Sequence, residues 1–331
     1  MPRVKSGAAV RALHHGALPS TTWPVETAVV AQTHRRPLGE SEHALFPLIL
    51  DVSAVGREGG AALLERFAAW GGNGVVVTDS ASSVAAETEA GSWLAGHRDR
   101  DRFLLIGRFG APEGAAATPR LLVTRIEDVL RRLRTDRLDV LAVRPDGAGR
   151  LDELLSAAEV LLSRGLVRTV VASGFAAEQL FEARVLAAHG LPRFCAVEVR
   201  YNLLEQQEAE GDLGLVAAGQ GLSLLSSVPL AHGFLRGVER TKRDLGRLPE
   251  GALAAAYIGR RGRRMLAALD AIGSELSAAP AAVALAWLLA RPHLAAATVA
   301  PRSPAEVDAL VRAVSLDLDA GHVAALDRAR R

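Results

Sequence analysis

The sequence predicts a closed (β/α)8 barrel of the TIM type, and three observations support this fold class. Eight short apolar segments recur along the chain, and segments with helical spacing of apolar residues lie between most of them. This alternation is typical of right-handed βαβ units and a parallel sheet. The chain has 331 residues, enough for the ~250 that one barrel needs. An open sheet favours a glycine-rich phosphate turn after its first strand, and residues 51–56 (DVSAVG) do not form one.

The predicted strands are short and rich in β-branched or other apolar residues. Residues 74–79 (GVVVTD) and 167–173 (VRTVVAS) are clear cases, because strands buried on both faces read as continuous apolar runs. In full, the expected strands are 46–52, 74–79, 103–109, 138–143, 167–173, 194–199, 222–227 and 297–300.

The predicted helices carry apolar residues three and four positions apart. Residues 120–134 show this best, since Ile126 and Val129 fall on one face and Thr118 and Pro119 provide a start signal. The other expected helices are 57–70, 86–96, 151–163, 176–188, 262–276, 279–290, 304–314 and 319–329, three of which place a tryptophan (Trp70, Trp93 and Trp287) in the core.

The domain organisation is expected to be simple. Residues 1–35 are predicted to form an N-terminal extension, because they have weak periodicity and several breakers, and residues 36–331 the barrel with its C-terminal helix. The basic start of the chain is not followed by the apolar segment of a secretory signal. No apolar run reaches the ~18 residues that span a bilayer. We therefore expect a cytoplasmic protein that does not contact membranes.

Composition narrows the classes of function. Of the 39 basic residues only Lys5 and Lys242 are lysines, a usage typical of high-GC bacterial genomes. The net charge is +2 and no segment interleaves basic with aromatic residues, so a nucleic-acid site is not predicted. Cys195 is the only cysteine, which excludes a disulfide framework and a cysteine metal site and favours inert packing. Residues 260–264 (RRGRR) indicate a solvated helix start, with an anion site as the alternative.

Six segments, in order and at matching spacing, resemble motifs of the aldo/keto reductase family. They are residues 36–42 (RPLGESE), 125–141 (RIEDVLRRLRTDRLDVL), 161–175 (LLSRGLVRTVVASGF), 194–207 (FCAVEVRYNLLEQQ), 226–237 (SSVPLAHGFLRG) and 279–307 (APAAVALAWLLARPHLAAATVAPRSPAEV). The first resembles the family's opening β-hairpin, and the match runs from about Arg36 to the C-terminus. The resemblance implies a barrel that reduces carbonyls with NADPH through a Tyr–Lys–His–Asp tetrad.

Three of the four tetrad positions depart from the family. Asp79 is kept, but Val84 stands where the resemblance places the Tyr, Arg108 the Lys and Arg144 the His. When hydride reaches a carbonyl carbon, the oxygen needs a proton at the same time, and the Tyr hydroxyl supplies it. Val84 has no such proton, and arginine does not release one. The resemblance therefore implies that ordinary carbonyl reduction has been lost.

Positions that the family uses to hold the nicotinamide differ as well. Ser173 is kept, whereas Gly174 replaces an Asn, Glu198 a Gln and Ser227 a stacking Tyr. Glu198 would suit the nicotinamide amide only as a protonated donor. Losing the stacking ring removes about 1 kcal/mol of aromatic contact. NADP is thus the cofactor that the resemblance implies, at a site whose nicotinamide end is altered.

The phosphate end is better preserved. Arg302 and Ser303 remain where the resemblance places the 2′-phosphate of NADP, at the start of the last barrel helix. A helix N-terminus binds anions readily. The alternative is that Ser303 only caps the helix.

The charged residues of the predicted mouth have two readings. Asp79, Arg108 and Arg144 are either a remodelled catalytic cluster or a salt bridge that fills an inactive mouth, since a buried carboxylate needs a partner. The carboxylates near the strand ends lack a histidine set beside them, so no metal site is predicted. His232, on the loop after the seventh strand, is either a ligand contact or general acid, or a surface histidine.

Three hypotheses follow for the function. In the first, the mouth binds a small molecule, an anion by the presence of Arg108 and Arg144, and acts without hydride transfer. In the second, the protein is a dead paralogue that works in a homo-oligomer or on a protein partner such as an active reductase. In the third, it still uses NADPH with a substitute acid, His232 or a water held by Asp79. Fold alone does not decide among them.

Overall fold

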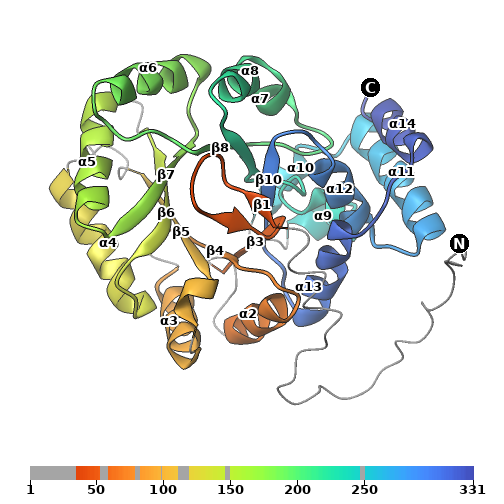
Figure 1. Ribbon diagram of the computed structural model, residues 1–331. Helices are drawn as coiled ribbons and strands as arrows, with labels where there is room; N and C mark the ends of the chain where they lie inside the picture. Colours follow the sequence, from red (N-terminus) through yellow and green to blue (C-terminus); the bar gives the residue numbers. More distant parts are fainter. Residues whose placement is uncertain are drawn as a thin grey trace, which may run out of the picture.

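The computed structural model describes residues 35–52, 59–78, 83–97, 99–110, 119–145, 150–246 and 250–331 (Figure 1). The predicted extension, residues 1–34, lies outside the described residues. So does Asp79, which the family resemblance predicts to be the Asp of the tetrad.

Eight parallel strands close into a barrel, which confirms the predicted fold class. Each strand pairs with its neighbours along the chain, and the last pairs with the first. The strands are β3 (Leu48–Asp51), β4 (Gly74–Thr78), β5 (Leu104–Gly110), β6 (Leu138–Arg144), β7 (Val167–Ser173), β8 (Ala196–Val199), β9 (Ser223–Ser226) and β10 (Leu294–Val299). All eight coincide with predicted strands, and β10 begins three residues before the predicted range.

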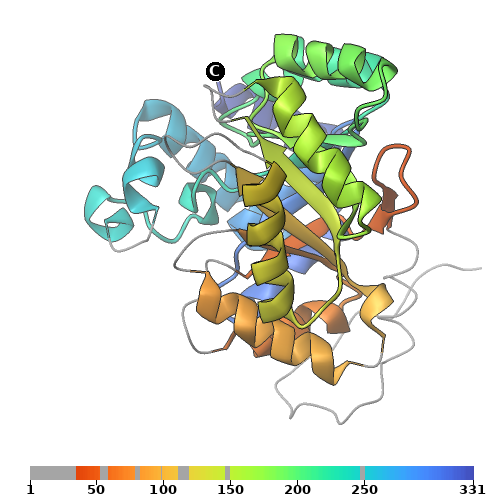
Figure 2. The same cartoon turned by 90° about the vertical axis from the view of Figure 1, so that its left-hand side faces the viewer.

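Helices surround the barrel, as Figures 1 and 2 show. Those close to prediction are α2 (Gly60–Ala69), α3 (Val84–Gly96), α4 (Pro119–Leu133), α5 (Leu151–Ser163), α6 (Ala177–Ala188), α11 (Arg260–Leu276), α12 (Pro280–Leu289), α13 (Pro304–Val311) with η3 (Arg312–Val314), and α14 (Ala320–Ala329). Sequence reasoning missed the short helices η1 (Arg100–Arg102), α7 (Gln207–Glu210), α8 (Asp212–Gly219), η2 (Phe234–Arg236), α9 (Lys242–Leu245) and α10 (Gly251–Ala255). Most of these are too short for an apolar periodicity to show.

A hairpin of β1 (Arg36–Pro37) and β2 (Ala44–Leu45) precedes the barrel, as the resemblance implied. Figure 2 shows it at one end of the barrel. Its turn residue Gly39 has φ +55°, and a Cβ there would lie 1.9 Å from the carbonyl oxygen of Cys195. Only glycine allows so close an approach. The hairpin buries Leu38 and Leu45 against the apolar interior of the barrel.

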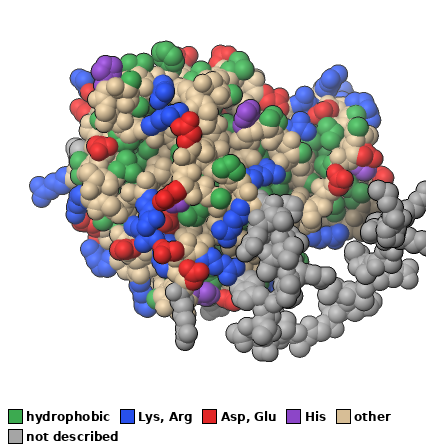
Figure 3. All heavy atoms as spheres, viewed as in Figure 1, with side chains coloured by type: hydrophobic (Ala, Val, Ile, Leu, Met, Phe, Trp, Pro, Cys, Tyr) green, Lys and Arg blue, Asp and Glu red, His purple; other side chains and the backbone are tan. Residues whose placement is uncertain are grey.

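The core has two parts, one between the strands and the helices and one inside the barrel. Trp287 and Cys195 are buried as predicted, while Trp70 and Trp93 are partly buried against the core. On the face in Figure 3, basic and acidic side chains are interspersed. Among the described helices none is by itself long and apolar enough to cross a membrane; α11 and α12 pass that test only as a pair bent by 95°.

Candidate functional site

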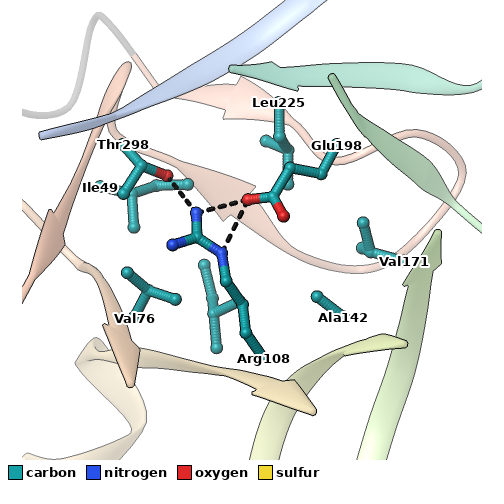
Figure 4. A pocket seen from close by; sticks show the side chains of 9 residues that line it. Ile49, Val76, Arg108, Ala142, Val171, Glu198, Leu225 and Thr298 are labelled. Atoms are coloured by element: carbon teal, nitrogen blue, oxygen red, sulfur yellow. Dashed lines mark hydrogen bonds and ion pairs between the residues drawn. The ribbon is translucent and has the colours of Figure 1, made fainter. Parts of the chain in front are cut away.

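The barrel interior changes from apolar to charged near the C-terminal ends of the strands. In β5, side chains alternate between the two faces of the sheet, so Ile106 and Arg108 point inward together. Figure 4 shows Arg108 reaching across the interior toward Glu198 of β8 and Thr298 of β10. The small pocket around them is lined by Ile49, Val76, Ile106, Arg108, Ala142, Val171, Glu198, Leu225 and Thr298. Active sites of such barrels form at this end.

Arg108 is the centre of a network that joins five strands. Its Nε donates to Glu198 Oε1 at 2.8 Å, its Nη2 donates to the same oxygen, and Nη2 also donates to Thr298 Oγ1 at 2.9 Å. Its Nη1 lies 3.4 Å from Asp51 Oδ2. The other oxygen of Glu198 accepts from Ser173 Oγ at 2.7 Å. We call these five residues the mouth network.

Two carboxylates hold the guanidinium in its charged form. Burial by itself would lower the pKa of Arg108, but the charges of Glu198 and Asp51 and the hydrogen bond from Glu198 outweigh it and raise the pKa. Arg108 therefore cannot serve as a proton donor. Both Glu198 oxygens have partners, Arg108 for one and Ser173 for the other, so the predicted contact of Glu198 with a nicotinamide amide stays a prediction.

The mouth network fills the middle of the barrel. The space left between the lining side chains is too narrow for a water molecule. The expected partner of Arg108, Asp79, is outside the described residues, and the partners found are Glu198 and Asp51. These two carboxylates are bridged by an arginine, and within the described part of the chain no group of acidic, His or Cys residues could hold a metal ion.

Arg144 lies apart from the mouth network. It ends β6, is exposed, and its side chain lies over Gly174, where an added Cβ would be 3.2 Å from Arg144 Nε. Gly174 has φ +67°, a conformation that glycine adopts without strain. A glycine at this position thus gives the arginine room. Among the described residues, Arg144 has neither an ion pair nor a hydrogen bond.

His232 and Ser227 are also separate from Arg108. Ser227 Oγ donates to the carbonyl oxygen of Val199 at 3.2 Å and so ties the end of β9 to β8. His232 Nδ1 lies 2.7 Å from Glu250 Oε2, and its ring stacks on Tyr257 at a centroid distance of 6.5 Å. Neither His232 nor Ser227 lines the pocket. The structure therefore gives no contact through which His232 would act on a group bound at Arg108.

The His232–Glu250 pair makes stability depend on acid pH. The hydrogen bond from His232 lowers the pKa of Glu250 below its ordinary value of 4.5, against the opposing effect of burial. A depressed carboxyl pKa stabilises the fold above the unfolded value, and this stability is lost as pH falls through the folded value. We expect the melting-temperature difference between wild type and Glu250→Gln to shrink below pH 4.5. A difference that stays constant down to pH 3 would contradict this assignment.

Two arginines and two glutamates meet at the start of α13. Arg302 Nη1 donates to Glu239 Oε1 at 2.9 Å, and its backbone N donates to Glu306 Oε2 at 2.7 Å. Arg236 Nη1 lies 2.7 Å from Glu306 Oε1. Ser303 Oγ accepts from the backbone N of Glu306 at 3.2 Å, which confirms the helix-cap interpretation of Ser303. We call Arg236, Glu239, Arg302 and Glu306 the α13 ion cluster.

Sequence reasoning missed several of these residues. Thr298 interrupts the apolar run of β10, and this single polar residue in a strand was a usable signal. Arg236 lies within the segment 226–237 that carries the family resemblance, where its charge follows the apolar residues Phe234 and Leu235, whereas Glu239 lies in a charged run that gives no such signal. Their pairing with Arg302 and Glu306 joins segments more than 60 positions apart, so no local pattern predicts it.

A sequence model of the Aldo/keto reductase family matches residues 54–331. This is most of the chain, and it agrees with the closed barrel. The chain belongs to the aldo/keto reductase family. NAD(P)H is the hydride donor that membership implies.

Characterised and uncharacterised relatives are distant in sequence. The norsolorinic acid reductase stcV of Emericella nidulans is 25% identical over 277 residues, covering 80% of this chain and 70% of that protein. The aldo-keto reductase ausK of Aspergillus calidoustus is 27% identical over 292 residues, covering 81% and 72%. The uncharacterized oxidoreductase YrpG of Bacillus subtilis is 31% identical over 198 residues, 59% of each chain. These relatives are fungal and bacterial, so the bacterial origin stays a prediction.

The residues at the predicted nicotinamide and phosphate ends of the cofactor site do not fit NADP well. At the nicotinamide end the Ser173 hydroxyl is engaged by Glu198, and Ser227 offers no ring for stacking. At the phosphate end Arg302 is engaged by two carboxylates. A 2′-phosphate brought to Arg302 would meet Glu239 and Glu306 at the same place, and like charges repel at such distances.

Proposed function

We propose that this family member no longer transfers hydride, and that its barrel mouth binds a small organic anion. The observation that carries the first half is the mouth network. Arg108, in the position of the tetrad Lys, is held by Glu198, and Glu198 takes up the Ser173 hydroxyl. The groups that would orient a nicotinamide and protonate a carbonyl oxygen are thereby either absent or engaged with one another.

Arg144 supports the second half of the proposal. It is an exposed cation at the C-terminal end of β6, the end of a barrel where ligands bind. Within the described residues it is unpaired, whereas Arg108 already faces two carboxylates. A guanidinium binds a carboxylate or phosphate through two parallel hydrogen bonds. The anionic ligand predicted from both arginines is therefore assigned to Arg144.

Thermal shift with simple anions tests this assignment. Benzoate and inorganic phosphate are the probes, and Arg144→Met is the variant. At a ligand concentration ten times Kd, binding adds about 1.4 kcal/mol to the stability of wild type, and we expect Arg144→Met to lose most of the resulting melting-temperature shift.

Arg131→Met is the matched control, because Arg131 is an exposed arginine on α4 whose ion pair among the described residues is with Asp128. It should keep the wild-type shift. If Arg144→Met keeps the shift as well, or if neither probe stabilises wild type, anion binding at Arg144 is refuted. The second of these outcomes would favour the scaffold or partner hypothesis.

A second candidate function is NAD(P)H-dependent carbonyl reduction with an unconventional acid. Family membership and the relatives named as reductases support it. Consumption of NADH or NADPH in the presence of aromatic aldehydes and ketones would reveal it. Turnover that rises in proportion to protein concentration would favour this candidate over the proposal above.

A further inference from the structure

We propose that Glu239 and Glu306 exclude phosphorylated ligands from Arg236 and Arg302, so that this chain discriminates against NADP(H) and other 2′-phosphates. The proposal concerns the α13 ion cluster and not the mouth network. A chain that still transferred hydride from NADH would satisfy it, and so its fate is separate from that of the proposed function.

Glu306 occupies the place that an anion would take at this helix start. One of its oxygens accepts from the backbone N of Arg302 at 2.7 Å and lies 3.7 Å from Arg302 Nε. The other lies 2.7 Å from Arg236 Nη1. A backbone N–H and guanidinium groups at a helix N-terminus are the donors that bind phosphate in proteins. The carboxylate of the chain itself already uses these donors.

Glu239 is the second carboxylate that binds Arg302. Its Oε1 accepts from Arg302 Nη1 at 2.9 Å, and its Oε2 is buried without a hydrogen-bond partner among the described residues. This leftover acceptor can accept a hydroxyl hydrogen, but it repels a phosphate oxygen. Arg236 cannot turn away to meet a ligand freely, because its Nη2 also donates to the Ala300 carbonyl oxygen at 2.6 Å.

The charges of the α13 ion cluster cancel, and burial of three of its four side chains strengthens the ion pairs. Two arginines face two glutamates, and the side chains of Arg236, Glu239 and Glu306 are 11%, 13% and 20% exposed. An incoming phosphate would have to break the Glu306 contacts with Arg236 and Arg302 and leave that carboxylate without a partner. Breaking the buried Arg236–Glu306 pair in this way is costly, whereas Arg302 is 47% exposed and its pairs contribute less. The arginines alone would predict a phosphate site, and the glutamates reverse that prediction.

Calorimetric titration of the full-length protein tests the proposal with two probes that differ in one phosphate. Adenosine 2′,5′-bisphosphate carries the 2′-phosphate, and adenosine 5′-monophosphate carries a hydroxyl there. We expect wild type to bind the bisphosphate no more tightly than the monophosphate. In the Glu239→Gln/Glu306→Gln variant, we expect bisphosphate affinity to rise at least about tenfold while monophosphate affinity changes less than about twofold.

The control is Asp128→Asn, which releases Arg131 from an exposed ion pair on α4. It should leave both affinities unchanged, so that a freed arginine alone does not explain a gain. A wild type that prefers the bisphosphate tenfold would overturn the proposal, as would a folded double variant with no gain. If the double variant does not fold, Glu239→Gln replaces it. Glu239 bonds the side chain of Arg302, whereas Glu306 also accepts from the backbone N of Arg302 at the start of α13.

Discussion

Replacing Arg108 with alanine is expected to lower the free energy of unfolding by about 3–5 kcal/mol. Arg108 is the cation that separates Glu198 from Asp51, and its removal leaves two carboxylates facing each other in the barrel. Glu198 is 6% exposed, so water cannot replace the lost guanidinium well. Urea denaturation at pH 7, followed by tryptophan fluorescence, measures the change.

Two further variants separate charge from packing. Arg108→Lys keeps the charge but loses the paired donors to Glu198 and Thr298, and it should cost less than alanine. Arg108→Met/Glu198→Met removes the arginine together with its more buried partner and leaves the more exposed Asp51, so it should also cost less than alanine. If Arg108→Ala costs under about 1 kcal/mol, the pair behaves like an ordinary surface salt bridge and does not hold the mouth together.

Returning family residues to the mouth is expected to restore reduction only when several change together. The variant carries Val84→Tyr, Arg108→Lys, Glu198→Gln and Ser227→Tyr. Val84 begins α3 and is 43% exposed, so the larger side chain of a tyrosine has room there. A positioned proton donor contributes about 10²–10⁴-fold to such a reaction, and we expect the rate of aldehyde reduction with NADH to rise by at least about 10²-fold.

Val84→Tyr alone is the matched control and should not raise the rate. In that variant Arg108 remains bound to Glu198, and position 227 still lacks a ring for the nicotinamide. The proposal that the mouth network prevents hydride transfer is wrong if Val84→Tyr alone raises the rate of aldehyde reduction as much as all four substitutions. It is equally wrong if the fourfold variant folds, binds NADH and still shows no gain.

The fold was largely predictable because its signals are local. The β-branched run of β4 and the apolar spacing of α4 identify these elements without any tertiary information. The closed sheet then follows from their alternation and number. Short helices such as α10, five residues long, carry no such periodicity and could not be predicted this way.

Some residues of the candidate site could be singled out from the sequence, but their contacts could not. Arg108, Glu198 and Ser173 were identified by their places in family motifs. Their joining into one network depends on the barrel bringing β5, β7 and β8 around a common interior. The capture of Arg302 by Glu239 depends likewise on a loop that returns to the start of α13. Contacts of this range follow from topology and side-chain geometry, which residue spacing does not encode.

The two charged clusters together show how the barrel can keep buried cations paired without a cofactor. In the barrel mouth, Glu198 binds Arg108, the arginine that the family resemblance places at the tetrad Lys. At the phosphate end, Glu306 binds the arginine that would meet the cofactor. In both places a glutamate of the chain satisfies a cation internally, so the barrel keeps buried charges paired without a cofactor.

The proposed loss of hydride transfer can be tested by following deuterium from the nicotinamide C4 of labelled NADH or NADPH to the carbonyl carbon of an aromatic aldehyde. The protein is kept in excess over the aldehyde, so that even a single slow turnover is detected by mass spectrometry of the alcohol. If the barrel has lost hydride transfer, the alcohol will contain no more label than in a sample without protein. Label that increases with protein concentration would show that the barrel still transfers hydride and would contradict it.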